Sequence, residues 1–253
     1  MEKLYLRLNI GLGDLIIFSP MVRYYASKYI VYTPVRKHNL PTFNRLFKSC
    51  DNINACMVDS GEHGDNQSDQ LADEYKKAGC HVISQSWNVY DTIQTGLRFD
   101  ELFYAENKLN FDDRWGKFEV TRDREREDEV YNTIVKSEKY IFLHDDAARN
   151  LKLDTSLLPD GVSVVRPEPG VSDTIVDYLT VMERAVEIHG MDSSFALLAD
   201  SVIDNKKMYL HRYVRQGISS ASYRKFIPHL KFNHQYGNKL RTACLLARDI
   251  MKS

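Results

Sequence analysis

Three short stretches of the sequence combine residue types that bind anions or move protons. The first, Gly11-Leu12-Gly13-Asp14, stands where a strand is expected to turn into a helix. Glycines there let the backbone approach a ligand, and the following helix N-terminus offers unpaired N–H groups to an anion. Asp14 has two interpretations, an acid that caps the helix or a catalytic base. The spacing alone favours the cap.

The second stretch, His144-Asp145-Asp146-Ala147-Ala148-Arg149, follows another expected strand. Arg149 and Lys152 are suited to bind phosphate, Arg149 through a bidentate fork. The two adjacent acids could instead hold a divalent metal ion. Equally consistent is a structural role, in which Asp145 or Asp146 caps the next turn and pairs with Arg149.

The third stretch, Asp192-Ser193-Ser194, separates a buried strand from a strongly amphipathic helix. The hydroxyls of Ser193 and Ser194, with the free N–H groups of the helix start, would suit a diphosphate. Asp192 is also explained as the N-cap of this helix. This stretch is the most informative in the chain.

Other candidates lie close to expected strand ends. His189 precedes the third stretch, and a histidine there is more often a satisfied strand-end residue than a ligand. Arg212 follows a later strand, and Glu168 lies in a rigid loop that could hold a base or ribose. The candidate residues for binding a phosphate-containing ligand are therefore Arg149, Lys152, Glu168, His189, Asp192, Ser193, Ser194 and Arg212.

Several common sites are disfavoured. A dinucleotide fingerprint would need a third glycine where Ile16 stands and an acid about twenty residues further on, where Tyr32-Thr33-Pro34 stands. The chain has no G-K-[ST] and no G-x-S-x-G sequence, so neither a P-loop nor a nucleophile elbow is expected. Its four cysteines form no C-x-x-C pair, which disfavours a zinc site and a disulfide framework.

The elements that must position these residues alternate as in a parallel α/β protein. Strands are predicted over residues 3–8, 29–33, 55–58, 81–84, 140–143, 161–165, 186–189 and 207–211. Helices are predicted over residues 14–28, 42–47, 68–78, 122–135, 173–184, 193–203 and 238–251. Residues 88–118 are rich in aromatic side chains and show no clean period.

This alternation predicts two α/β units that divide near residues 112–137. We expect one α/β domain over residues 1–120 and a second over residues 121–253, with a linker helix near 122–136. Ligands of such sheets bind at the carboxyl ends of the strands, so the site is expected in the cleft between the domains. The C-terminal helix is expected to pack back toward the N-terminal domain.

Composition and charge limit the class of protein and the kinds of partner that are expected. Hydrophobic residues make up 43% and charged residues 27% of the 253 residues, which excludes disordered and collagen-like classes. Residues 206–253 hold 11 of the 34 Lys and Arg but one of the 35 Asp and Glu. Such a basic segment suits an anionic ligand, an acidic acceptor or a membrane surface, although pairing with the acidic remainder of the chain explains it equally well.

The cellular location follows from the same sequence features. The chain begins with no signal-peptide pattern and has no apolar run long enough to span a bilayer, so a cytoplasmic protein is expected. The basic C-terminal segment would also allow peripheral contact at the inner membrane face. Nucleic acid is not an expected partner, because aromatic and basic residues do not interleave.

Together the motifs resemble a GT-B glycosyltransferase, nearest to the lipopolysaccharide heptosyltransferase group, glycosyltransferase family 9. They also resemble uncharacterised polysaccharide-type transferases. In family 9 an opening strand leads to an Arg…Gly-Asp turn, an apolar helix with an early proline, and later an Asp-Ser/Thr-Gly helix start with a Leu-Ala step. The matching residues are Arg7, Gly13, Asp14, Pro20, Asp192-Ser193-Ser194 and Leu198-Ala199. Ser194 replaces the usual glycine, and Leu197 stands where histidine is common.

The resemblance implies two Rossmann-like domains facing a cleft, with the acceptor side over residues 1–120 and the nucleotide-sugar-binding side over residues 121–253. It also implies a hexosyl- or heptosyl-type transfer from a nucleotide-diphosphate sugar to a glycan or glycolipid hydroxyl. The phosphate-binding candidates of the second domain would then be donor-binding residues. Asp14 would be the base that deprotonates the acceptor, with inversion in one displacement. Arg149, the helix start at Ser193-Ser194, and Arg212 would stabilise the leaving diphosphate without a metal ion, and no cofactor would be needed.

Three alternatives stay open. A nucleotide-sugar hydrolase or epimerase shares the same architecture. A metal-dependent transferase would use Asp145 and Asp146. A catalytically inactive nucleotide-sugar-binding module would keep the fold without the chemistry.

Overall fold

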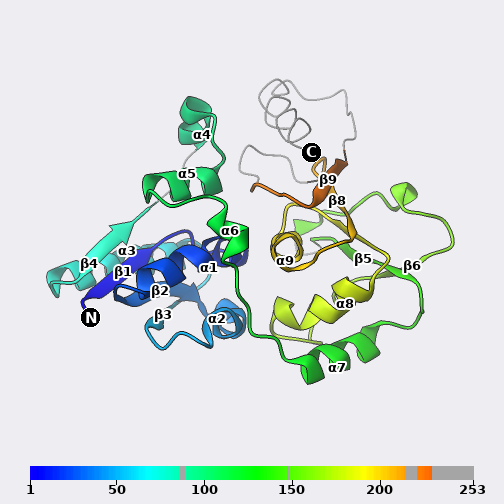
Figure 1. Ribbon diagram of the computed structural model, residues 1–253, viewed down its shortest axis with the longest axis horizontal. Helices are drawn as coiled ribbons and strands as arrows, with labels where there is room; N and C mark the ends of the chain where they lie inside the picture. The colour runs from blue at the N-terminus through cyan, green and yellow to red at the C-terminus, as the bar shows by residue number, and fades with distance from the viewer. Residues whose placement is uncertain (86–88, 147–148, 215–220, 230–253) are drawn as a thin grey trace.

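The computed structural model describes residues 1–85, 89–146, 149–214 and 221–229, and these form two parallel β-sheets joined by one linker (Figure 1). The first sheet has the order β3-β2-β1-β4 and the second the order β6-β5-β7-β8-β9, and every strand pair is parallel. The predicted parallel α/β class is therefore confirmed, with two separate sheets.

The first half comprises β1 (Lys3–Arg7), α1 (Leu12–Ala26), β2 (Ile30–Arg36), η1 (Lys37–Asn39), α2 (Leu40–Phe47), β3 (Ile53–Val58), α3 (Gly61–Lys77) and β4 (His81–Ser84). Helix α1 is buried along most of its length and contains Pro20. Proline lacks the N–H that would bond to the Ile16 carbonyl. The Ser19 hydroxyl donates to that carbonyl instead, at 3.0 Å, so α1 continues through the proline.

The second half comprises α7 (Arg124–Ile134), β5 (Tyr140–His144), η3 (Thr155–Leu157), β6 (Ser163–Val165), η4 (Ile175–Tyr178), α8 (Leu179–Arg184), β7 (Glu187–Gly190), α9 (Ser194–Val202), β8 (Lys207–His211) and β9 (Phe226–His229). The Asp123 carboxylate accepts from the Arg126 N–H at 3.2 Å and so caps the charge-dense helix α7. That helix follows the linker, where it was predicted.

Three short helices, α4 (Val89–Thr95), α5 (Phe99–Glu106) and α6 (Asp113–Gly116), lie between the halves in the sequence. With residues 221–225 they form what we call the junction. Asp100 on α5 accepts from the N–H and hydroxyl of Ser222 at 2.9 and 3.2 Å and pairs with Arg114. Asp200 on α9 accepts from the Trp115 indole N–H at 2.6 Å, and α6 lies between α1 and α9 (Figure 1).

The predicted elements agree closely with the structure where the pattern was regular. Residues 81–84 and 207–211 form strands with the predicted bounds, whereas residues 173–184 form a 3₁₀ turn followed by α8. The helices α4 to α6 and strand β9 were not predicted. The predicted helix over 238–251, and its packing, lie outside the described residues. No helix in the described part of the chain is apolar over a length that would cross a bilayer.

Candidate functional site

Asp14 lies in the first turn of α1, the helix that follows β1. The Gly11 N–H donates to its Oδ2 at 3.1 Å, so the carboxylate caps its own helix, as one of the two interpretations predicted. It also lines a small cavity of about 20 Å³, with Asn9, Thr33 and Asn39 among the polar walls. That volume has room for about one water-sized group. The cap fixes the carboxylate beside this cavity.

The starts of α1 and α9 meet although they belong to different halves. A Cβ on Gly13 would lie 2.9 Å from Cδ1 of Leu197, so only glycine allows this approach without movement of the leucine. Leu197 is bonded through its N–H to the Ser193 carbonyl at 3.0 Å. The turn that carries Asp14 therefore lies within one helical turn of the Ser193-Ser194 stretch.

Ser193, not Asp192, caps α9: its hydroxyl accepts from the Ala196 N–H at 3.4 Å. Asp192 accepts from the Tyr223 hydroxyl at 2.7 Å instead. Burial, with the Asp192 carboxylate beside it, raises the pKa of Tyr223, so this phenol stays a proton donor. Arg212 lies over the same ring at 5.8 Å, so Tyr223 brings two of the predicted residues together.

His144 is a residue of this region that the list of predicted site residues did not include. It ends β5 beside Gly190, and its ring packs against Phe195 in a tilted arrangement with centroids 4.5 Å apart. Its Nδ1 is enclosed and has no hydrogen-bond partner among the described residues. Burial lowers the pKa of His144 to about 4, against the opposing effect of Asp146 and Asp145. A neutral imidazole therefore stands at the first turn of α9.

The two acids after His144 are engaged within the protein. Asp145 accepts from the Leu153 N–H at 2.7 Å and pairs with Arg166 at 2.9 Å. Asp146 accepts from the Arg149 N–H at 3.1 Å and pairs with its guanidinium at 2.7 Å, as the structural interpretation predicted. In the described part of the chain, no three metal-ligating side chains converge.

Three other predicted site residues are either enclosed, as His189 is, or exposed on other segments, as Glu168 and Lys152 are. His189 is 2% exposed, and its ring nitrogens contact Glu187 at 3.1 Å and His211 at 2.9 Å, so it faces the interior of the second half. Glu168 is exposed, and its backbone carbonyl accepts from the Tyr178 hydroxyl at 3.1 Å. Lys152 is exposed on the segment that follows Arg149.

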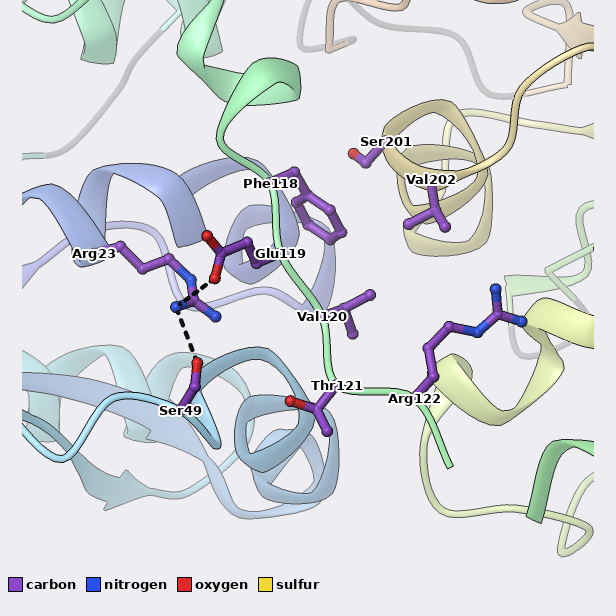
Figure 2. Close-up of a pocket in the computed structure, with 9 residues that line it drawn as sticks. All are labelled: Arg23, Ser49, Phe118, Glu119, Val120, Thr121, Arg122, Ser201 and Val202. Carbon is purple, nitrogen blue, oxygen red and sulfur yellow. Dashed lines mark hydrogen bonds and ion pairs between the residues drawn. The ribbon is translucent and has the colours of Figure 1, made fainter. Parts of the chain in front are cut away.

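A larger cavity, of about 490 Å³, lies along the linker (Figure 2). Arg23 from α1 and Val202 from α9 line it, and both lie near the C-terminal ends of their helices, away from Asp14 and Ser193. Arg23 pairs there with Glu119 at 3.1 Å. This cavity is therefore at the opposite end of α1 and α9 from the candidate site.

No protein-family model and no curated protein sequence matches the chain. Solved glycosyltransferases do match its structure. A glycosyl transferase family 9 protein of Veillonella parvula DSM 2008 is 11% identical, with a TM-score of 0.56 over 99% of this chain and 90% of that one. The E. coli ADP-heptose lipopolysaccharide heptosyltransferase II is 12% identical, with a TM-score of 0.51 over 100% and 99% of the two chains.

A third match is the iron-containing dodecameric glycosyltransferase TibC of enterotoxigenic E. coli H10407. It is 12% identical, with a TM-score of 0.51 over 93% of this chain and 64% of that one. At such identities the likeness concerns the fold. The chain thus resembles glycosyltransferases of family 9 and the heptosyltransferase group in fold, as its motifs predicted.

Proposed function

We propose that this chain is a glycosyltransferase that moves a sugar from a nucleotide-diphosphate donor to a hydroxyl of a glycan or glycolipid, with inversion and without a metal ion or cofactor. The contact between Gly13 and Leu197 carries the proposal, because it brings the turn with Asp14 against α9 one helical turn after Ser193. The fold likeness to glycosyltransferases supports the reaction class. The first half takes the acceptor and the second half the donor, in a GT-B arrangement.

In this mechanism Asp14 acts as the general base. Its carboxylate takes the proton of the acceptor hydroxyl while the oxygen forms a bond to the anomeric carbon. The bond from that carbon to the diphosphate oxygen breaks on the opposite face, and its electron pair leaves with the nucleoside diphosphate. Attack from the face opposite the leaving group inverts the anomeric centre.

The leaving diphosphate needs stabilisation of its developing charge. The N–H groups of Ser194 and Phe195 have no acceptor among the described residues and stand at the positive end of α9. The exposed cations of Arg149 and Lys152 extend from the neighbouring segment. Preorganised donors of this kind stabilise an anion that forms in the transition state.

The first experiment identifies the donor nucleotide. We expect one of UDP, GDP, ADP, CMP and dTDP to raise the unfolding midpoint of the purified chain well above the others, because a ligand that binds only the folded state stabilises it. The sugar nucleotide of that base is then assayed for transfer to glycan and glycolipid acceptors. Release of the sugar at the same rate without any acceptor would indicate a hydrolase instead.

The second experiment tests the base. Asp14→Asn keeps an oxygen that accepts the Gly11 N–H, so α1 still begins normally, but it removes the proton acceptor. We expect transfer to fall by roughly 10²–10⁴-fold while nucleotide affinity stays unchanged. Asp123→Asn, which alters the corresponding cap of α7, is the matched control and should keep the wild-type rate. Wild-type turnover by Asp14→Asn would overturn the assignment.

A further inference from the structure

A chain of hydrogen bonds runs along one face of β7 and β8 toward the strand ends. His189 Nε2 contacts Glu187 Oε2 at 3.1 Å, and His189 Nδ1 contacts His211 Nε2 at 2.9 Å. His211 Nδ1 contacts the Tyr213 hydroxyl at 3.0 Å, and that oxygen accepts from the Asp154 backbone N–H at 3.1 Å. His189 and His211 are both buried.

One arrangement of these contacts has both imidazoles neutral and every proton directed the same way. The Tyr213 oxygen accepts from the Asp154 N–H, and in this arrangement its own hydroxyl proton points to His211 Nδ1. His211 then donates from Nε2 to His189, and His189 donates from Nε2 to the Glu187 carboxylate. A neutral histidine provides one donor and one acceptor, so the two rings fit this order.

The chain ends on the short segment Leu151-Lys152-Leu153-Asp154. Backbone bonds of 3.0 and 2.9 Å tie Leu151 to Asp146 on one side of Lys152. On its other side, Leu153 donates to Asp145 and is 5% exposed, and Asp154 donates to Tyr213. Lys152 itself is exposed, so the fixed backbone on both sides determines where its ammonium group can reach.

We propose that Glu187, His189, His211 and Tyr213 form a positioning chain that holds the Lys152 segment for the donor diphosphate. The inference rests on the proposed function, and it gives His189 a role behind the site instead of in contact with the ligand. A cation that is held in place loses less freedom when it binds an anion, so part of the donor affinity comes from this enclosed chain.

Tyr213→Phe tests the last link, since it removes the oxygen that accepts the Asp154 N–H and contacts His211 Nδ1. We expect faster hydrogen exchange of the Asp154 amide and of residues 151–154, measured without any ligand. We also expect about five-fold weaker binding of the nucleoside diphosphate that binds best among UDP, GDP, ADP, CMP and dTDP, the effect of one neutral hydrogen bond. In a Lys152→Ala background the same substitution should leave affinity unchanged.

Tyr140→Phe is the matched control. The Tyr140 hydroxyl donates to the Val181 carbonyl at 2.7 Å, also within the second half, but at the amino end of β5. Both variants lose one hydrogen-bonded tyrosine hydroxyl, and only Tyr213→Phe should change exchange at residues 151–154 and nucleotide affinity. His211→Phe supplies a second break in the chain, and adding Tyr213→Phe to it should weaken binding no further.

The outcomes separate the two proposals. If Tyr213→Phe matched Tyr140→Phe in exchange and in affinity, the positioning chain would be refuted while the glycosyltransferase proposal stood. Failure of the wild-type chain to bind any of the five nucleotides would refute the proposed function. The exchange comparison would still decide whether the chain holds the Lys152 segment.

Discussion

Asp100 in the junction and His144 at the end of β5 are both enclosed polar side chains, but their surroundings differ. Asp100 is fully buried and is met by Arg114 and by two donors of Ser222. His144 has an enclosed Nδ1 for which the described residues offer no partner. The contacts of Asp100 hold the junction together. His144 instead leaves one ring nitrogen for a further hydrogen bond, at the edge of the sheet where ligands of parallel sheets bind.

The comparison extends to Asp200 and Asp14. Asp200 is 0% exposed and accepts from Trp115 and from the N–H groups of Arg224 and Lys225, at 2.6 to 3.2 Å. Asp14 is partly exposed and lines a cavity. The Asp200 carboxylate is enclosed by its donors and joins the two halves. The Asp14 carboxylate borders a cavity, so it stays accessible to a group of a substrate.

The largest effect is expected from breaking the junction. Asp100→Asn leaves the Arg114 guanidinium in an enclosed site without its counter-charge. We expect the free energy of unfolding, measured in urea, to fall by about 3–5 kcal/mol. Asp112→Asn is the control: that carboxylate is 69% exposed in its pair with Arg224, so its loss should cost about 0.5 kcal/mol or less.

A change below 1 kcal/mol for Asp100→Asn would show that the junction does not depend on this buried charge. The proposed difference between the junction and the strand ends would then be wrong for Asp100.

The second effect concerns His144 and pH. Its pKa is lowered from 6.5 to about 4 by burial, so the unfolded chain binds a proton in this range before the folded chain does. Stability should therefore fall as the pH drops from 6.5 to 4, by about 3 kcal/mol in total from this residue. Unfolding in urea at several pH values measures the slope.

The variant His144→Asn should remove about 1 kcal/mol per pH unit of that slope. His81→Asn, at an exposed histidine, is the control and should leave the slope unchanged. An unchanged slope in His144→Asn would show that this imidazole is solvated, contrary to its enclosed position against Phe195.

The third effect tests how closely the two helix starts approach. Gly13→Ala gains up to about 1 kcal/mol of helix propensity and loses a similar amount by pushing on Leu197, so its net effect should be small. In a Leu197→Ala background the clash is absent and only the gain remains. The double-mutant cycle should therefore give a coupling of about 1 kcal/mol in urea unfolding; zero coupling would refute the close contact.

The sequence predicted the regular part of the fold because strands and helices there repeat with a clear hydrophobic period. Helices α5 and α6 were missed because the inward residues at them include charges: Arg98 and Arg114 are 1% exposed and Asp100 is fully buried. A hydrophobic pattern cannot reveal a helix whose buried face is held by ion pairs. Ser222, which donates to Asp100, lies more than a hundred residues further along the chain, and residue spacing does not indicate so distant a contact.

The same limit applies to the candidate site. The turn at Gly11–Asp14 and the helix start at Ser193 were recognised, because glycines and capping residues have local signatures. The cap was placed one residue early, on Asp192, since its contact with Tyr223 comes from distant sequence. His144 was passed over for the same reason: its enclosure against Phe195 arises only when β5 and β7 pair.

The smallest effect on stability, and the sharpest contrast with the junction, is expected at Arg149. Its guanidinium is 64% exposed in its pair with Asp146, so Arg149→Ala should change the free energy of unfolding by about 0.5 kcal/mol or less. If Arg149 binds the donor diphosphate, nucleotide affinity should nevertheless fall about ten-fold or more, as for a lost charge-assisted hydrogen bond.

Arg184→Ala is the matched control, because Arg184 is 52% exposed in a comparable pair with Asp128 on the far side of the second half from β5's carboxyl end. Both variants should unfold like the wild type, and titration with the best-bound nucleoside diphosphate should distinguish them. Equal affinities would assign Arg149 only its pairing with Asp146. A selective loss at Arg149 would show that an exposed ion pair at the strand ends opens to a ligand, which the sealed pairs of the junction cannot do.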